Sequence, residues 1–234
     1  MVVALTIVRY PKIYIPIAII AMAVHRIPLL LQARCSFWKL LGCGKNGSFD
    51  LQPDLQQWGL LSVWDSQEDF DLFYSRSFVS RWWRAFTEEQ WTVFCSPLET
   101  RGKWDEKEPF KPVVADDDYD GPVAVLTRAT IRLSRIKRFW SNVGRVSDLM
   151  SSADGYVFSL GIGEAPVFKQ ATFSVWRSAK EMKLFAYSSA EHLDVIKKTR
   201  NENWYSEELF ARFKPVGSFG SLKGRDPLKE FLNS

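Results

Sequence analysis

Histidine and cysteine are scarce in this chain of 234 residues, and neither shows a metal-binding spacing. There are 2 histidines, His25 and His192, and 3 cysteines, Cys35, Cys43 and Cys95. An odd number of cysteines without a CxxC pair gives no support to a zinc ribbon, a thioredoxin-type site or a disulfide framework. Two histidines so far apart argue against a catalytic zinc site built from protein ligands alone.

Phosphate-binding and hydrolase motifs are also missing from the sequence. The stretch Gly161–Pro166 lacks the third glycine of a dinucleotide-binding loop, and there is no G-x-S-x-G or H-E-x-x-H motif. A net charge of +4 is too small to indicate a nucleic-acid-binding protein. With 13 glycines and 11 prolines, the chain is not of a low-complexity or collagen-like type.

Large aromatic rings, by contrast, are abundant, with 10 Trp and 17 Phe. Such a composition predicts a ring-packed core, and it can also line a slot for a bulky apolar ligand. The length allows one core, or two small half-domains that share an interface.

The first thirty residues contain an apolar run, Ile13–Val24, between Lys12 and His25. The run is too short to span a membrane. A second apolar stretch lies before it, where a secretory signal has its polar region, so a signal peptide is only the alternative. We expect a strand over Val2–Tyr10 and a helix over Lys12–Gln32. This helix has no clean polar face, which leaves contact with a membrane surface open.

The sequence repeats itself once. Trp64–Phe73 matches Trp176–Phe185, 112 positions later, with an identical Trp-x-Ser start and Leu-Phe end. Three further matches follow in the same order at offsets of 121, 119 and 118: Ala4–Thr6 with 125–127, Leu41–Gly44 with 160–163, and Pro97 and Gly102 with Pro215 and Gly220. Offsets that drift slightly while the order is kept are typical of two copies that differ in loop length.

Each copy reads strand, helix, strand, strand, helix, strand, which is the ferredoxin-like βαββαβ pattern. The fold class that we predict is α+β, with two fused ferredoxin-like repeats forming a dimeric-α/β-barrel-like fold around a cavity, helices outside. The expected domains are residues 1–99, a solvated acidic linker at 100–121, and residues 122–234. Predicted strands are 2–10, 37–41, 58–64 and 91–96, then 123–133, 156–161, 169–176 and 209–216. Predicted helices are 12–32, 66–86, 135–151 and 179–201.

His192 is the first candidate site residue. Within residues 190–200, Val195, Ile196 and Thr199 follow it at spacings of 3, 4 and 7, which places it on the apolar face of a helix. A single inward imidazole is what a five-coordinate haem requires, although a hydrogen-bonded core histidine gives the same pattern. The equivalent position in the first copy is Ser80. His25, at the end of the apolar run, has a weaker claim as a ligand.

Arg128 is the second candidate site residue, both catalytic and cofactor-binding. It lies within a predicted strand and shares a face with Leu126 and Thr130. A cation inside the barrel could hold a haem propionate or polarise oxygen. The alternative is an arginine that points outward into solvent.

Several blocks in one order resemble the spheroidene monooxygenase family, the acyclic carotenoid 2-ketolases of bacterial carotenoid biosynthesis. The blocks that carry the resemblance are Phe37-Trp-Lys-Leu-Leu-Gly-Cys-Gly44, Trp91-Thr-Val-Phe94, Gly121-Pro-Val-Ala-Val-Leu-Thr-Arg128, Gln170-Ala-Thr-Phe-Ser-Val-Trp176, Trp204-Tyr-Ser-Glu-Glu-Leu-Phe210 and Gly224-Arg-Asp-Pro-Leu228. The resemblance implies a haem-iron, O2-dependent oxidoreductase that takes electrons from reduced ferredoxin. It also implies an acyclic carotenoid substrate. The cysteine usage favours a reducing, cytoplasmic location, and the apolar helix leaves contact with the membrane surface open. Nucleic acid is not an expected partner.

Two other functions are consistent with the same architecture. One is a cofactor-free monooxygenase or apolar-ligand-binding barrel, in which His192 is a core residue. The other is a non-enzymatic protein that binds an apolar pigment at the membrane. The visible spectrum of the purified protein separates all three.

Overall fold

The structure is a computed structural model, and it describes residues 1–45, 52–111, 119–165, 167–188, 198–199 and 201–232. The elements of the first half are β1 (Val2–Arg9), η1 (Lys12–Tyr14), α1 (Ile15–Val24), α2 (Arg26–Leu30), β2 (Cys35–Gly44), β3 (Pro53–Trp64), α3 (Gln67–Arg76), α4 (Phe78–Phe86) and β4 (Glu89–Gly102). Those of the second half are β5 (Val123–Ile131), η3 (Leu133–Arg135), α5 (Ile136–Ser151), β6 (Tyr156–Ala165), β7 (Lys169–Trp176), α6 (Ala179–Ser188), β8 (Tyr205–Gly220) and α8 (Lys229–Leu232).

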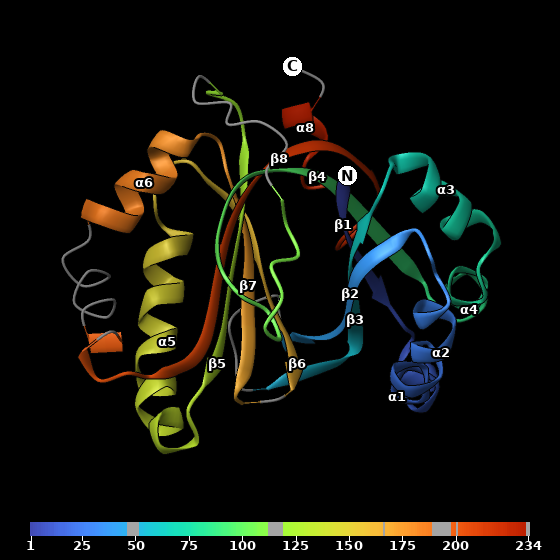
Figure 1. The fold of residues 1–234 in the computed structure, drawn as a ribbon, viewed down its shortest axis with the longest axis horizontal. Helices are drawn as coiled ribbons and strands as arrows, with labels where there is room; N and C mark the ends of the chain where they lie inside the picture. The colour runs from blue at the N-terminus through green and yellow to red at the C-terminus, as the bar shows by residue number, and fades with distance from the viewer. Residues whose placement is uncertain (46–51, 112–118, 166, 189–197, 200, 233–234) are drawn as a thin grey trace.

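The strands form one closed barrel in the order β1-β3-β2-β6-β7-β5-β8-β4. Within each half the order is β4-β1-β3-β2 or β8-β5-β7-β6, which is the ferredoxin-like arrangement. The two sheets join edge to edge, β2 with β6 and β4 with β8, and all of these pairs are antiparallel. Helices α1–α4 cover one side of the barrel, and α5 and α6 cover the opposite side (Figure 1). The predicted fold class is confirmed.

The internal repeat is visible in the strand register. Val2 pairs with Trp64 and Val123 pairs with Trp176, so the two tryptophans occupy equivalent ends of β3 and β7. At the two joins, residues that the repeat makes equivalent face each other, Cys43 with Ile162 and Ser96 with Lys214. A residue that faces its own counterpart lies on a twofold axis. The halves are therefore related by a pseudo-twofold axis that passes through both joins.

One hydrophobic cluster occupies the barrel interior. Two short plug segments, residues 103–110 and 221–228, contribute to it. Trp104 and Phe110 come from the first, and Leu222 and Leu228 are their counterparts in the second. Each plug segment begins with an isolated bridge, Trp104 with Lys107 and Leu222 with Arg225. The expectation that residues 100–121 form a solvated linker is therefore wrong as far as Phe110. Residues 100–102 belong to β4, and Trp104 and Phe110 are part of the core.

Two predicted helices are each divided in two. Ser77 adopts an extended conformation between α3 and α4, and its hydroxyl accepts a hydrogen bond from the Ser80 N–H, which starts a new helix. His25 separates α1 from α2. Pro28 has no amide hydrogen to donate, so one bond of a continuous helix is missing there. The predicted strands are confirmed, with β2, β3, β4, β6 and β8 longer than expected.

Gly102 and Gly220 end the long strands of the two copies and both have φ of 85°. A Cβ at Gly102 would overlap the carbonyl oxygen of Glu208, and a Cβ at Gly220 would overlap that of Gln90. We expect Gly102→Ala and Gly220→Ala each to lower the free energy of unfolding by about 1–3 kcal/mol, because a side chain is strained at this φ. Chemical denaturation measures the change.

Gly144→Ala is the matched control for these variants. Gly144 lies on an exposed part of α5, and a Cβ there meets no atom within 4 Å. This variant should raise the free energy of unfolding by about 0.5–1 kcal/mol, since alanine favours the helix. A loss at Gly144 equal to that at Gly102 would contradict the explanation.

Candidate functional site

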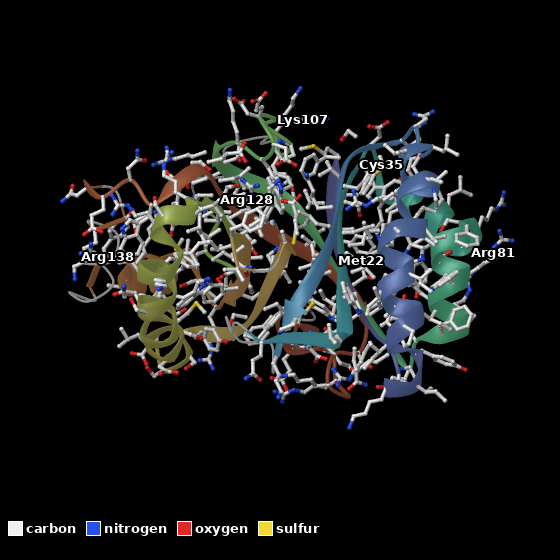
Figure 2. All side chains as sticks on the ribbon, turned by 90° about the horizontal axis from the view of Figure 1, so that it is seen from below. Met22, Cys35, Arg81, Lys107, Arg128 and Arg138 are labelled. Carbon is white, nitrogen blue, oxygen red and sulfur yellow. The ribbon has the colours of Figure 1, made fainter. Side chains whose placement is uncertain are left out.

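Arg128 points into the barrel from β5. Its neighbours Ala124 and Leu126 belong to the interior cluster, whereas Val125 belongs to the cluster under the helices. Because side chains alternate along a strand, Arg128 shares the inner face. Its side chain is 1% exposed, so the outward-pointing alternative is wrong. Figure 2 labels it among the strands of the barrel.

The Arg128 guanidinium lies within reach of three carboxylates. It forms an ion pair with Glu207, and its second terminal nitrogen lies 3.5 Å from Glu164 and 3.6 Å from Asp105. The indole ring of Trp104 lies under it, with the guanidinium carbon 5.4 Å from the ring centroid. The cation is therefore compensated by this chain's own side chains.

Two lysines complete this arrangement, which we call the barrel-end cluster: Lys39, Arg128, Lys169, Asp105, Glu164 and Glu207. Lys39 pairs with Glu164 at 2.9 Å and also with Asp105, while Lys169 pairs with Asp105 at 3.1 Å. The Trp104 indole donates to Glu164 at 2.7 Å. Three cations thus face three carboxylates, and the contacts made by Trp104 and Asp105 hold the first plug segment against the barrel.

Glu207 fixes the turn of the first plug segment. Its carboxylate accepts hydrogen bonds from the backbone N–H groups of Asp105 and Glu106, at 3.1 and 2.8 Å. Burial alone would raise the pKa of Glu207, but these donors and the charge of Arg128 outweigh it and lower the pKa. Glu89 does the same for the second plug segment, accepting from Lys223 and Gly224. The main role of the barrel-end cluster is therefore to stabilise the fold.

The layer between the sheet and the helices differs between the two copies. In the first copy, Thr6 pairs with Leu60 and Thr92 on the adjacent strands, and all three are fully buried. The equivalent residues of the second copy are Thr127, Thr172 and Phe210, and Thr127 pairs with the other two. Thr127 is exposed although it lies in the middle of β5, and Thr172 and Phe210 are half-buried.

The core of the second copy is interrupted at the same place. One cluster runs along the whole of β1 in the first copy, from Val2 to Val8. In the second copy the described residues form two separate clusters, one around Val123 and Val125 and the other around Ile131. We call the region between these two clusters, bordered by Thr127, Thr172 and Phe210, the second-copy interlayer; most of the segment that corresponds to α4 of the first copy lies outside the described residues. An apolar ligand can contact the sheet there.

Arg212 lies on the same side of the sheet as the interlayer. Arg212 belongs to β8 and pairs with Val125 of β5. Its neighbours on β8, Ala211 and Phe213, face the barrel interior. One terminal nitrogen lies 3.5 Å from Glu99, but the buried Nε has no hydrogen-bond partner within the described part of the chain. A buried donor without a partner suits an anionic group of a ligand. Sequence reasoning missed Arg212, although its alternation with Ala211 and Phe213 signals the helix side.

His25 is buried on the first copy at the break between α1 and α2. Its ring makes edge contacts with Phe78, Trp82 and Trp83, with centroids 5.5–6.3 Å apart. Burial lowers the pKa of this imidazole to about 4, so it is neutral at pH 7. Aromatic rings surround it, which leaves it a core residue.

His192 lies outside the described residues, and its role as a haem ligand stays a prediction. The role of Arg128 also stays a prediction, and it requires a ligand on the inner side of the sheet. Arg128 faces the barrel interior, whereas Thr127 and Arg212 face the helices, so the two regions lie on opposite sides of the sheet. A ligand in the interlayer contacts Arg212 and not Arg128.

Three curated proteins match most of the chain. The chain is 36% identical over 214 residues to spheroidene monooxygenase from Cereibacter sphaeroides, which covers 91% of the chain and 66% of that protein. It is 36% identical over 215 residues to the Rhodobacter capsulatus protein of the same name, covering 92% of the chain and 89% of that protein. The chain belongs to the spheroidene monooxygenase family. A third relative, from Rubrivivax gelatinosus, is 36% identical over 198 residues.

Two solved structures share the fold of this chain. Aldoxime dehydratase in complex with butyraldoxime has a TM-score of 0.60, with 10% identity, over 99% of this chain and 84% of that one. A second aldoxime dehydratase structure has a TM-score of 0.59 over 92% of this chain and 80% of that chain. No family model matches the chain. Membership of the spheroidene monooxygenase family supports a monooxygenase as the coarse activity class.

The difference between the two copies can be tested by placing a larger side chain at the equivalent positions 6 and 127. We expect Thr6→Leu to lower the free energy of unfolding by about 1–3 kcal/mol, because it overpacks a full core. It also breaks the 2.9 Å hydrogen bond to Thr92. Thr127→Leu should change stability by less than about 0.5 kcal/mol, as at a surface position. Chemical denaturation measures the free energy of unfolding of both variants. Equal losses would mean that Thr127 is packed as densely as Thr6, which would contradict this interpretation.

The barrel-end cluster predicts a loss of stability in acid. The folded pKa of Glu207 is below its ordinary 4.5, so its stabilising contribution is present at neutral pH and is lost as the pH falls below that value. Between pH 7 and a pH below 4.5, Glu207→Gln should therefore lose less stability than the unaltered chain; the loss that remains comes from groups such as Asp105 and Glu89, whose pKa values are also lowered. Glu208→Gln, at the exposed neighbouring position, is the control. A wild-type pH profile in Glu207→Gln would refute this role.

Proposed function

We propose that the chain is a monooxygenase that oxidises a terminal carbon of an acyclic carotenoid to a 2-ketone. The observation that carries the proposal is the match to three spheroidene monooxygenases, at 36% identity over 85–92% of the chain. The aromatic-rich composition, with 10 Trp and 17 Phe, is compatible with a long apolar substrate. The proposal includes a cytoplasmic location with contact at the membrane surface, where such a substrate dissolves.

The reaction proposed is two successive hydroxylations at one carbon. In each round, one atom of O2 enters a C–H bond and the other leaves as water, with two electrons and two protons taken up. The second round gives a gem-diol, which loses water to form the ketone. Reduced ferredoxin, a one-electron donor, is the proposed electron source, so each round requires two donor molecules.

Haem is the cofactor in this proposal, and when bound it supplies activation of O2. The described residues of the second copy are compatible with it. Thr127 is exposed in the middle of the sheet, and the Nε of Arg212, which has no partner within the described residues, suits a propionate. Thr127, Thr172 and Phe210 would contact the macrocycle, Arg212 would orient it, and His192 would be the axial ligand.

The visible spectrum and the product together test this function. Purified full-length chain, expressed with a haem precursor, is incubated with an acyclic carotenoid, O2 and reduced ferredoxin. A Soret band and a ketone labelled from ¹⁸O2 support the proposal. Ketone without a Soret band indicates the cofactor-free monooxygenase, and carotenoid bands without turnover indicate a pigment-binding protein. Either of the last two results refutes the haem enzyme.

His192 and His25 provide the sharpest pair of variants. His192→Ala should abolish stoichiometric haem binding and ketone formation while the circular dichroism spectrum is kept. His25→Ala should retain the haem, because His25 is enclosed by Phe78, Trp82 and Trp83 in the other copy. Haem titration followed at the Soret band measures both. Full occupancy in His192→Ala with an unchanged spectrum would show that the ligand assignment is wrong.

Arg212 and Arg128 distinguish the two sides of the sheet. With haem in the interlayer, Arg212→Ala should weaken haem affinity by about tenfold, the loss of one charged hydrogen bond. The role predicted for Arg128, as a partner of a propionate or of oxygen, requires a ligand inside the barrel. Weaker haem affinity or oxygen turnover in Arg128→Ala, with Arg212→Ala unaffected, would place the haem there instead.

A further inference from the structure

The helices α1 and α2 expose an unusual amount of apolar surface. Residues Lys12–Leu30 form a helical stretch of 19 residues that is, by length and composition alone, long and apolar enough to cross a membrane, contrary to the expectation from Ile13–Val24, because the apolar character continues through α2. In its most apolar 18-residue window only 22% of the residues are buried. A narrow stripe contacts the rest of the protein: Ala18, Ala21, His25 and Leu29. The remaining large side chains form what we call the α1–α2 outer face: Ile13, Ile19, Ile20, Val24, Ile27, Leu30 and Leu31. Four of them, Ile13, Ile27, Leu30 and Leu31, are 67–79% exposed.

This helical segment is fixed to the outside of the barrel. Tyr14 packs edge-on against Phe86 with centroids 5.5 Å apart, and His25 packs against Trp82 at the same separation. Figure 2 shows α1, marked by Met22, beside α4, marked by Arg81. The strand β1 precedes the segment and is paired on both sides, with β3 and β4. The segment is therefore positioned to lie along a surface, with its outer face free.

The charges around this face have one sign. Between residues 12 and 34 the charged side chains are Lys12, Arg26 and Arg34, and no Asp or Glu is present. Arg34 lies 3.6 Å from Asp65. Lys12, Arg26 and the exposed Arg81 of α4 have no carboxylate partner within the described part of the chain. An apolar helical face with uncompensated basic residues is complementary to an anionic lipid surface.

We propose that the α1–α2 outer face inserts into the interface of an anionic bilayer, with the helices in the membrane plane. Ile13, Ile27 and Leu30 enter the acyl boundary, and Lys12, Arg26 and Arg81 contact phosphate groups. This deepens the proposed function, because it brings a carotenoid-oxidising chain to the phase that dissolves its substrate. The binding itself does not require that activity.

Vesicle co-sedimentation of the purified full chain tests the proposal. The chain should sediment with vesicles of phosphatidylcholine and phosphatidylglycerol, and more weakly with phosphatidylcholine alone. Ile27→Glu/Leu30→Glu should weaken binding by at least about tenfold, since two buried aliphatic contacts are replaced by repelled charges. Leu72→Glu/Leu133→Glu is the matched control, because both residues are exposed leucines elsewhere, 51% and 76% exposed. Circular dichroism verifies that both variants are folded.

Three results would overturn this assignment. They are no sedimentation of the unaltered chain with either vesicle, equal loss in the control variant, or a dimer that Ile27→Glu/Leu30→Glu dissociates without any vesicle binding. Activity separates this inference from the proposed function. With substrate in detergent, Ile27→Glu/Leu30→Glu should keep wild-type turnover, and with substrate in vesicles it should lose it. Vesicle binding without turnover in either medium refutes the proposed function alone.

Discussion

Closure of the barrel at its two joins is the constraint on which the rest of the structure depends. Each ferredoxin-like sheet has two edge strands, and the joins β2–β6 and β4–β8 connect both edges to the other sheet, the first through the pairs Gly42 with Gly163 and Cys43 with Ile162 alone and the second along a long ladder. The β4–β8 join continues as far as Gly102 and Gly220, whose positive φ turns the chain back into the barrel. The plug segments that follow fill the interior with Trp104, Phe110 and their counterparts.

Much of this architecture is readable from local sequence patterns. The Trp64 and Trp176 match gives the repeat, and strand alternation gives the faces of β7. The interior charge at Arg128 is not readable in this way, because its partners Asp105, Glu164 and Glu207 come from three distant segments. A lone arginine in a strand pattern suggests solvent until those carboxylates are placed beside it.

The candidate site shows the same division. Helical spacing predicts an apolar face that carries His192, which lies outside the described residues, and family resemblance adds the expectation of haem. The interlayer could not be predicted, because Thr6 and Thr127 are the same residue type at equivalent positions and differ only in their burial in the folded chain. Ser77, by contrast, is followed by Ser80 at capping distance, a local signal for the break between α3 and α4 that the helical periodicity concealed.

The difference in burial between Thr6, which is fully buried, and Thr127, which is exposed, has a consequence for how such a barrel can be constructed. In a symmetric dimer of identical half-size chains, every substitution occurs twice, so opening one helix–sheet layer opens the other and removes two cores at once. Covalent fusion uncouples the halves. One half can keep a dense core, of the kind around Phe70, Phe73 and Trp83. Its sister then has the freedom to hold a ligand, and the assembly acquires a single asymmetric site.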